Sequence, residues 1–182
     1  MKKLITAFAV IAVAVVAFTV SSCNQSDVIV IQNMDEINQC LSYSSFEGTT
    51  VYVFSLSKSD VQAAFQAAGV SFDLEKVKNA KVSQIKAEVT TTAATFNDIS
   101  GFEVYVRKPG ASMSEAIQVA YVGNIANNAT EVTLNINGTD LKALLSENVL
   151  EIVLRVTNKN GSGAPICMKL KEGKLEYTVK AK

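Results

Sequence analysis

The chain has 182 residues, with 17 Lys and Arg against 17 Asp and Glu and no histidine. This balance argues against a nucleic-acid partner, because binding to phosphates needs an excess of basic side chains. The absence of histidine excludes Ser-His-Asp and Cys-His catalysis and removes the commonest ligand of transition metals. We therefore expect no metal site and no cofactor.

The chain opens with the layout of a secretory signal peptide. Residues 1–3 form a basic head, and residues 4–20 are an apolar run broken only by two threonines. That run approaches the shortest stretch that can span a bilayer, so an uncleaved membrane helix is an alternative. A signal that is cleaved to release a soluble chain is another.

The segment Val20-Ser21-Ser22-Cys23 resembles the lipobox of bacterial lipoproteins and departs from the commonest pattern only at Val20, where Leu is usual. In that family the cysteine thiol carries a diacylglycerol, a signal peptidase cuts before the cysteine, and the new amino group is usually acylated. The resemblance implies a helical signal peptide at residues 1–22 and a lipidated Cys23 at the head of a short tether, residues 23–27. Two or three acyl chains hold a protein firmly to a membrane.

Asn24 bears on which membrane receives the anchor. In some enteric lipoproteins an Asp at this position retains the protein in the inner membrane, and here the residue is Asn. We therefore expect a cell-envelope protein that is anchored in the outer membrane through the lipid on Cys23.

Cys40 and Cys167 remain in residues 28–182, which we expect to form a single domain. An exported chain folds in an oxidising compartment, and a disulfide between these two would close a loop of more than a hundred residues. Cys167 alternates in phase with Lys169 and Lys171, which favours the wetter face of a strand. Two separate unpaired thiols are the alternative.

The first part of the domain mixes strand and helix patterns. Residues 28–31 are apolar and predict a short strand, whereas the sequence NMDE and the spacing of apolar residues predict helical turns over 33–41. Residues 49–56 are rich in β-branched and aromatic side chains and predict a strand. Helical spacing predicts an amphipathic helix over 60–68, which Gly69 ends.

From residue 80 onward the apolar residues recur with a period of two. Residues 85–91 and 102–106 alternate in this way, and Lys108-Pro109-Gly110 then predicts a turn. Thr139 is the expected N-cap of a short helical turn through residue 145. Residues 158–163 and 172–173 are expected to connect hairpins. Further strands are expected at 117–122, 132–136, 149–156, 166–170 and 175–179.

Seven to nine short strands separated by turns predict an all-β fold, an antiparallel β-sandwich with one or two short helices. A parallel sheet is disfavoured, because the crossover helices that it needs are absent. The pattern resembles small immunoglobulin-like lipoproteins of the bacterial envelope. That resemblance implies the architecture alone.

Few residues in the sequence suggest a catalytic or ligand-binding site. Carboxylate pairs could support glycoside hydrolysis, which needs only two acids at a suitable separation, but each pair lies in a polar stretch that is typical of a solvated face. The pairs are Asp73 with Glu75, Glu147 with Glu151, and Glu172 with Glu176. Tyr105 lies out of phase with its apolar neighbours and could face a ligand, although a tyrosine that covers the outer sheet face is the simpler interpretation.

We therefore expect a non-enzymatic, lipid-anchored envelope protein that binds a protein or a glycan or has a structural role. A carboxylate-dependent glycan hydrolase is the alternative. An exposed apolar or aromatic patch would favour binding, whereas a perturbed carboxylate pair in a cleft would favour the enzyme.

Overall fold

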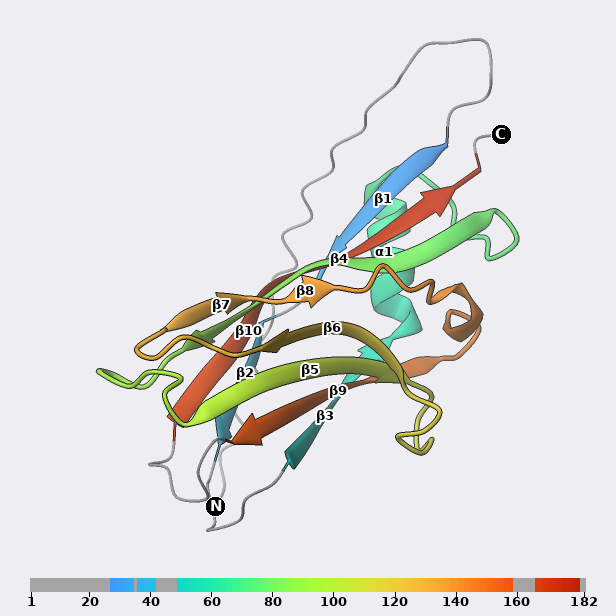
Figure 1. Ribbon diagram of the computed structural model, residues 1–182. Coiled ribbons are helices and arrows are strands. Elements are labelled where there is room, and N and C mark those ends of the chain that lie inside the picture. The colour runs from blue at the N-terminus through green and yellow to red at the C-terminus, as the bar shows by residue number, and fades with distance from the viewer. Residues whose placement is uncertain (1–26, 35, 42–48, 159–165, 181–182) are drawn as a thin grey trace, which may run out of the picture.

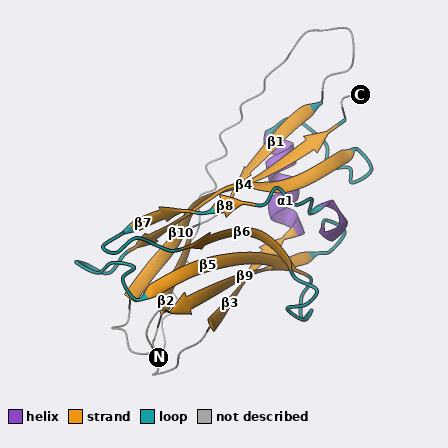
Figure 2. Cartoon of the chain, in the orientation of Figure 1, coloured by secondary structure: helices purple, strands orange, loops and turns teal. Residues whose placement is uncertain are grey.

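The structure is a computed structural model that describes residues 27–34, 36–41, 49–158 and 166–180. Two antiparallel sheets stack face to face, and a short helix lies beside them (Figure 1). Strands account for most of the described chain (Figure 2). The predicted all-β sandwich is confirmed.

The first sheet has a long central strand that carries two short strands along one side. β10 pairs with β1 and then with β2 on that side and with β4 on the other, and β4 pairs in turn with β7. The bounds are β1 Val28–Asn33, β2 Ile37–Leu41, β10 Ile166–Val179, β4 Val77–Val89 and β7 Glu131–Thr133.

The second sheet runs in the order β3, β9, β5, β6, β8, so β3 and β8 are its edges. The inward-facing side chains of its central strands are buried and join those of the first sheet in one core. The bounds are β3 Thr49–Ser57, β9 Val149–Asn158, β5 Ile99–Arg107, β6 Ile117–Gly123 and β8 Asn135–Ile136.

The strand order is that of a jelly roll. β1 with β2 forms one interrupted edge strand, and β7 with β8 forms one strand that passes from the first sheet to the second at the buried Leu134. The eight strands that result are arranged in the two sheets as in the two Greek keys of a jelly roll. In an immunoglobulin domain the first two strands share a sheet, whereas β1 and β3 do not. The immunoglobulin-like arrangement was wrong, because period-two patterning identifies strands but not the sheet that each one joins.

Helix α1, Lys58–Ala67, begins two residues before the predicted start. Ser57 and Asp60 form the capping box: the Ser57 hydroxyl accepts from the Asp60 backbone amide, and the Asp60 carboxylate accepts from the Ser57 backbone amide. The helix ends as predicted before Gly69, whose φ of 69° suits glycine. Phe65 is fully buried, and its ring lies 5.1 Å from that of Tyr177.

The helical turns predicted over residues 33–41 are wrong, because residues 37–41 form strand β2. Ile37 and Leu41 are four apart, a spacing that fits both one face of a helix and every second position of a strand. Pairing with β10 settles the choice, since it places Ile37 opposite Leu170. Backbone hydrogen bonds to a central strand outweigh a weak local preference for helix.

Residues 172–173 form a bulge within β10 rather than the predicted hairpin. Glu172 has a φ of 51°, and the pairing of β10 with β4 shifts between Lys171 and Lys174. Gly173 accepts a 2.8 Å hydrogen bond from the Met34 backbone amide, and a Cβ at residue 173 would lie 3.1 Å from the Met34 Cβ. The positive φ of Glu172 therefore bends β10 at this bulge but does not reverse the direction of the chain.

The predicted cap at Thr139 is also wrong. The short 3-10 helix spans Lys142–Leu144, and the side chain that organises the turn is Asp140. Its Oδ1 accepts 2.9 Å hydrogen bonds from the backbone amides of Lys142 and of Ala80 in β4. The carboxylate therefore ties the turn to the first sheet. The hairpin expected at residues 158–163 is wrong, because the strands that this segment connects, β9 and β10, lie in different sheets.

Candidate functional site

The lipidation site lies outside the described residues, as do the signal peptide at 1–22 and nearly all of the tether. Asp27 is the first described residue, and its carboxylate lies 2.7 Å from the Lys78 ammonium of β4. Within the described ranges, no helix combines the length and the apolar character that crossing a bilayer would take. The same ranges hold no group of three or more His, Cys, Asp or Glu side chains placed to bind a metal ion.

Cys40 and Cys167 are joined by a disulfide, with an S–S distance of 2.03 Å. The two residues lie directly opposite each other in the β2–β10 pairing, with their Cα atoms 3.9 Å apart. On its other side, the Cys167 backbone amide donates to the Thr91 hydroxyl at 2.6 Å. The bridge therefore ties the short edge strand β2 to the centre of the first sheet.

The acids nominated for hydrolysis are spread over separate ion pairs. Five of the six face a Lys or Arg, and such pairs are ordinary features of a solvated sheet surface. The distances are 3.4 Å for Asp73 to Lys76, 2.8 Å for Glu147 to Lys108, 2.8 Å for Glu151 to Arg107, 3.0 Å for Glu172 to Lys86 and 3.1 Å for Glu176 to Lys81. The sixth, Glu75, donates its backbone amide to Asp73 Oδ1.

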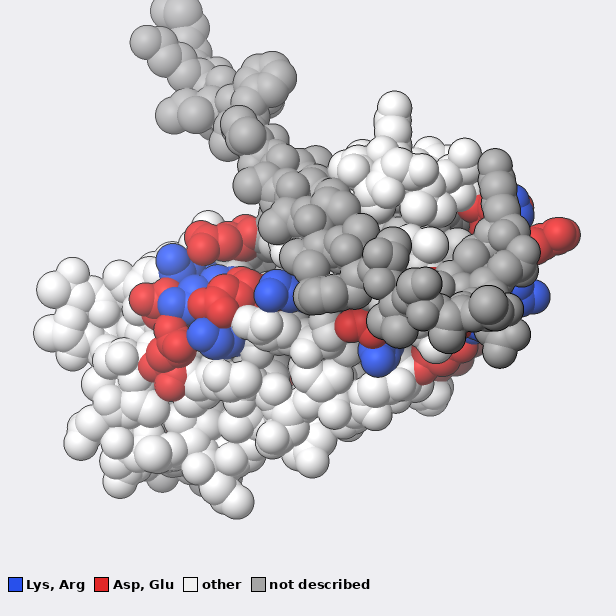
Figure 3. All heavy atoms as spheres, turned by 90° about the horizontal axis from the view of Figure 1, so that it is seen from above, with Lys and Arg blue, Asp and Glu red and all other residues white. Residues whose placement is uncertain are grey.

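A dense group of charges covers the outer face of the first sheet over β4, β7 and β10 (Figure 3). We call it the charged cluster, and its members are Glu36, Lys86, Glu88, Glu131, Lys169, Lys171 and Glu172. Lys171 lies at its centre, 2.7 Å from Glu88 and 2.5 Å from Glu131. Lys86 lies directly opposite Lys171 in the pairing, and Glu172 at 3.0 Å offsets the repulsion between the two lysines.

Hydrogen bonding shifts the titration of this cluster. The Lys171 ammonium lowers the pKa of Glu131 and of Glu88 below the ordinary value of 4.5. Its bonds to Glu131 and Glu88 raise the pKa of Lys171, and the bond to Glu172 raises the pKa of Lys86. Every member therefore has a partner of opposite charge, which makes the cluster a mutual network rather than a site that awaits a charged ligand.

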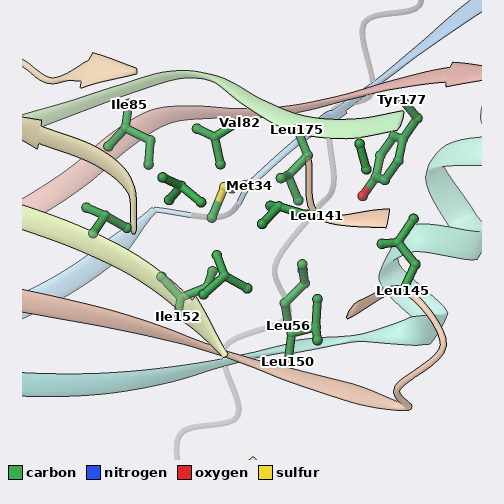
Figure 4. A pocket seen from close by; sticks show the side chains of 14 residues that line it. Met34, Leu56, Val82, Ile85, Leu141, Leu145, Leu150, Ile152, Leu175 and Tyr177 are labelled. Carbon is green, nitrogen blue, oxygen red and sulfur yellow. The ribbon is translucent and has the colours of Figure 1, made fainter. Parts of the chain in front are cut away.

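A small cavity of about 20 Å³ lies between the sheets (Figure 4). Apolar side chains from both sheets and the 141–145 segment line it, with Tyr177 at one end. The volume is about that of one water probe, and an apolar lining offers water too few hydrogen bonds. This cavity is therefore a packing defect and not a binding site.

A second hollow opens at the side of the sandwich, between the edge strands of the two sheets and the start of α1. We call it the edge cleft. Its volume is about 90 Å³, and it is lined by Gln32, Asn33, Met34, Ile37, Phe54, Ser55, Leu56, Asp60, Ala64 and Ile152. Met34, Leu56 and Ile152 also line the interior cavity, so the cleft leads toward the core.

Gln32 is the distinctive residue of the edge cleft. It is the one buried polar side chain of the described core, with 4% of its surface exposed. Its Oε1 accepts a 2.5 Å hydrogen bond from the Tyr177 hydroxyl, whose pKa is raised by burial. Gln32 therefore places a hydrogen-bonding side chain on the wall of the edge cleft.

Gln32 was not predicted as a site residue, although the sequence contains a signal for it. Gln32 shares the phase of Val30, which is fully buried in β1. The predicted strand ended at residue 31, so the phase was not extended to the polar residue that follows. A glutamine at an inward strand position predicts a hydrogen-bonded group in the core.

Tyr105 lies on the outer face of the second sheet and is half-buried. It is paired with Val153 in β9 and with Gln118 in β6, and the Gln118 amide donates to its hydroxyl at 3.4 Å. Tyr105 does not line the edge cleft. Its position agrees with that of a tyrosine that covers a sheet face.

Comparison with known proteins adds little. No protein-family model matches the chain, and no curated protein matches it. Among solved structures, a chain of Desmodium yellow mottle tymovirus aligns with 91% of this chain and 95% of its own length, at 8% identity and a TM-score of 0.29. A TM-score this low carries no argument. The fold therefore rests on the strand pairing described above.

Proposed function

We propose that this chain is a lipid-anchored protein of the bacterial cell envelope, held in the outer membrane through Cys23, and that its sandwich binds another molecule without catalysing a reaction. The anchor rests on the order of basic head, apolar run and small residues before Cys23. The binding role rests on one observation, the edge cleft, whose wall includes the buried polar side chain of Gln32.

The other surfaces give less support to an enzyme. Glycoside hydrolysis needs two acids across one bond, one of them protonated. Five of the six nominated acids instead lie in separate ion pairs with Lys or Arg, and the interior cavity is small and apolar. The edge cleft contains one carboxylate, Asp60, and that group already caps α1.

The short tether constrains how the sandwich sits on the membrane. Five residue steps separate Cys23 from Val28, so the start of β1 lies within about 17 Å of the anchor even when the tether is fully extended. The start of β1 and the end of β10 lie together at one end of the sandwich (Figure 1). That end faces the lipid in this proposal, and the disulfide between Cys40 and Cys167 lies farther along the sheet.

Metabolic labelling with a fatty acid tests the anchor. We expect the unaltered chain to be labelled and to enter the membrane fraction, and Cys23→Ala to lose both properties. The control is the double substitution Cys40→Ser and Cys167→Ser, which removes the other two thiols and keeps the label. Label that persists in Cys23→Ala would overturn the lipid anchor. Protease treatment of intact and lysed cells then determines which side of the outer membrane carries the domain.

A further inference from the structure

The disulfide between Cys40 and Cys167 joins two strands that are held in different ways. Cys167 lies in the central strand β10, and its carbonyl oxygen accepts hydrogen bonds from the backbone amides of Thr90 and Thr91, at 2.7 and 3.3 Å. Its own amide donates to the Thr91 hydroxyl at 2.6 Å. Cys40 lies in β2, which pairs with β10 on one side and with no described strand on the other. The bridge therefore links a fixed residue to the edge of the sheet.

Cys40 is the accessible half of the bridge. It is an exposed residue, whereas Cys167 is half-buried. Thiol–disulfide exchange requires a thiolate to reach one of the two sulfurs, and exposed disulfides are more readily reduced than buried ones. An external thiolate therefore reaches the Cys40 sulfur more easily than the Cys167 sulfur.

The strand β2 depends on the bridge because its other contacts are few. It has five residues. Two of them are exposed and two are half-buried, namely Asn38 and Cys40, and Ile37 and Gln39. A short edge strand with little buried surface opens locally at a small cost in free energy. While the disulfide is intact Cys40 cannot leave Cys167, so the bridge blocks this opening.

The same strand forms one wall of the edge cleft. Ile37 lines the cleft and lies opposite Leu170 of β10. Met34 also lines the cleft, but its backbone amide is bound to the Gly173 carbonyl at 2.8 Å, a contact that does not involve the bridge. Loss of the bridge would therefore free the wall at Ile37 and leave the wall at Met34 in place.

We propose that the bridge between Cys40 and Cys167 is a thiol–disulfide exchange site that a dithiol protein of the cell envelope reduces, and that its reduction releases β2 and opens the edge cleft at Ile37. This inference rests on the proposed function, which supplies the oxidising compartment and the role of the cleft. The partner is a dithiol because a single thiol would leave a mixed disulfide on Cys40, which the adjacent Cys167 thiol would reverse.

The reduction proceeds in two exchange steps. A thiolate of the partner attacks the Cys40 sulfur, so a mixed disulfide forms and the electron pair of the broken S–S bond leaves on the Cys167 sulfur, which takes up a proton. The second thiolate of the partner then attacks the partner's own sulfur in the mixed disulfide, which closes the partner's disulfide and releases Cys40 as a thiol. The chain gains two electrons and two protons, and the partner loses them.

Reduced thioredoxin, which carries such a dithiol, is the probe. The protein is the full chain with Cys23→Ala, so Cys40 and Cys167 are its only cysteines. The rate of reduction is measured in increasing urea below the unfolding transition. For attack on the folded chain, we expect the rate to change by less than about twofold per molar urea, whereas attack through global unfolding would speed it about fivefold or more per molar.

A thioredoxin variant whose second active-site cysteine is replaced by serine identifies the sulfur that is attacked. The reaction with this variant stops at the mixed disulfide, which is quenched in acid at early times and located by peptide mass spectrometry. We expect at least about tenfold more mixed disulfide on Cys40 than on Cys167, because the exposed sulfur reacts faster.

Hydrogen exchange tests the release of β2. We expect reduction to bring the amides of β2 to within about tenfold of the exchange rate of unstructured amides, while the amides of β9 in the other sheet stay protected. The matched control is the double substitution Cys40→Ser and Cys167→Ser in the same Cys23→Ala background. Its β2 amides should exchange rapidly with or without a reducing agent.

Three results would overturn the proposal. The first is no reduction by thioredoxin, or a rate that rises with urea as global unfolding does, because the bridge would then be purely structural. The second is equal attack on Cys40 and Cys167. The third is equal protection of β2 in the oxidised and reduced chains. None of these results depends on lipid at Cys23, so they leave the anchor untouched, and a failure of fatty-acid labelling leaves these rates unchanged.

Discussion

The Tyr177 hydroxyl donates a 2.5 Å hydrogen bond to Oε1 of Gln32, joining β10 to β1 inside the core. Tyr177 is fully buried, and Gln32 is 4% exposed. This pair brings hydrogen-bonding groups into a core that is otherwise apolar, and it fixes the orientation of the Gln32 amide. The nitrogen of that amide is then held in a constant position on the wall of the edge cleft.

Tyr177→Phe should destabilise the fold by about 1–3 kcal/mol, because it leaves a buried carbonyl oxygen without a donor. Gln32→Met keeps the shape of the side chain and removes its polar atoms. We expect the double variant to lose less free energy of unfolding than the two single variants together, by about 0.5–3 kcal/mol. Urea unfolding of the four proteins measures this coupling, and additive losses would contradict it.

Gly101 and Gly123 lie opposite each other in β5 and β6 and form a matched pair for a second test. A Cβ on Gly101 would lie 2.7 Å from the Val122 carbonyl oxygen, whereas a Cβ on Gly123 would meet nothing within 4 Å. Gly101→Ala should therefore cost about 1–3 kcal/mol of stability. Gly123→Ala should change it by no more than about 0.5 kcal/mol. Thermal unfolding compares the two, and equal losses would mean that the strands can move apart at Gly101.

Sequence patterns predicted the elements whose cause is local. β3, β5 and β9 have the alternation and the β-branched content of strands, and α1 has a capping box and an apolar stripe. These features act within a few residues, so they can be read from the chain. Gln32 lies in the same strand phase as the buried Val30, so its inward position could also have been predicted from the local pattern.

The features that depend on distant contacts could not be predicted. Nothing near Leu134 indicates that the chain changes sheets there, and β2 is a strand only because β10 lies beside it. The edge cleft depends on five elements that meet across the fold, β1, β2, β3, α1 and β9. Two of its lining residues, Gln32 and Asp60, are 28 residues apart in sequence. Apolar and polar residues alternate along the strands of a jelly roll and of an immunoglobulin domain in the same way. The alternation therefore could not predict the strand order.

The disulfide between Cys40 and Cys167 provides the next prediction. It closes a loop with a sequence separation of 127 residues, and removing such a bridge typically costs about 2–5 kcal/mol. In a Cys23→Ala background, the double substitution Cys40→Ser and Cys167→Ser should lower the guanidinium midpoint by a corresponding amount. A reducing agent should lower the midpoint of the parent and leave that of the double variant unchanged. Equal midpoints in parent and variant would contradict this role.

The charged cluster makes the stability of the fold depend on pH through Lys171. Glu88 and Glu131 have pKa values below 4.5 in the folded chain and return to 4.5 when it unfolds. A lowered carboxylate pKa contributes stability that is present above pH 4.5 and is lost as the pH falls through the folded value. For Lys171, whose pKa is raised above 10.5, the contribution is present below pH 10.5 and is lost as the pH rises through the folded value.

Urea midpoints measured between pH 7 and pH 3 should therefore fall once the pH is below 4.5. Lys171→Met removes the ammonium that lowers both carboxyl pKa values and leaves Glu88 and Glu131 to repel each other. Its midpoint should be lower than that of the parent at pH 7, and the difference should shrink toward pH 3, where both acids are protonated. Lys142→Met, outside the cluster, is the control and should follow the parent. If the urea midpoint of Lys171→Met also changes with pH as that of the parent does, the cluster does not contribute to the acid sensitivity of the fold.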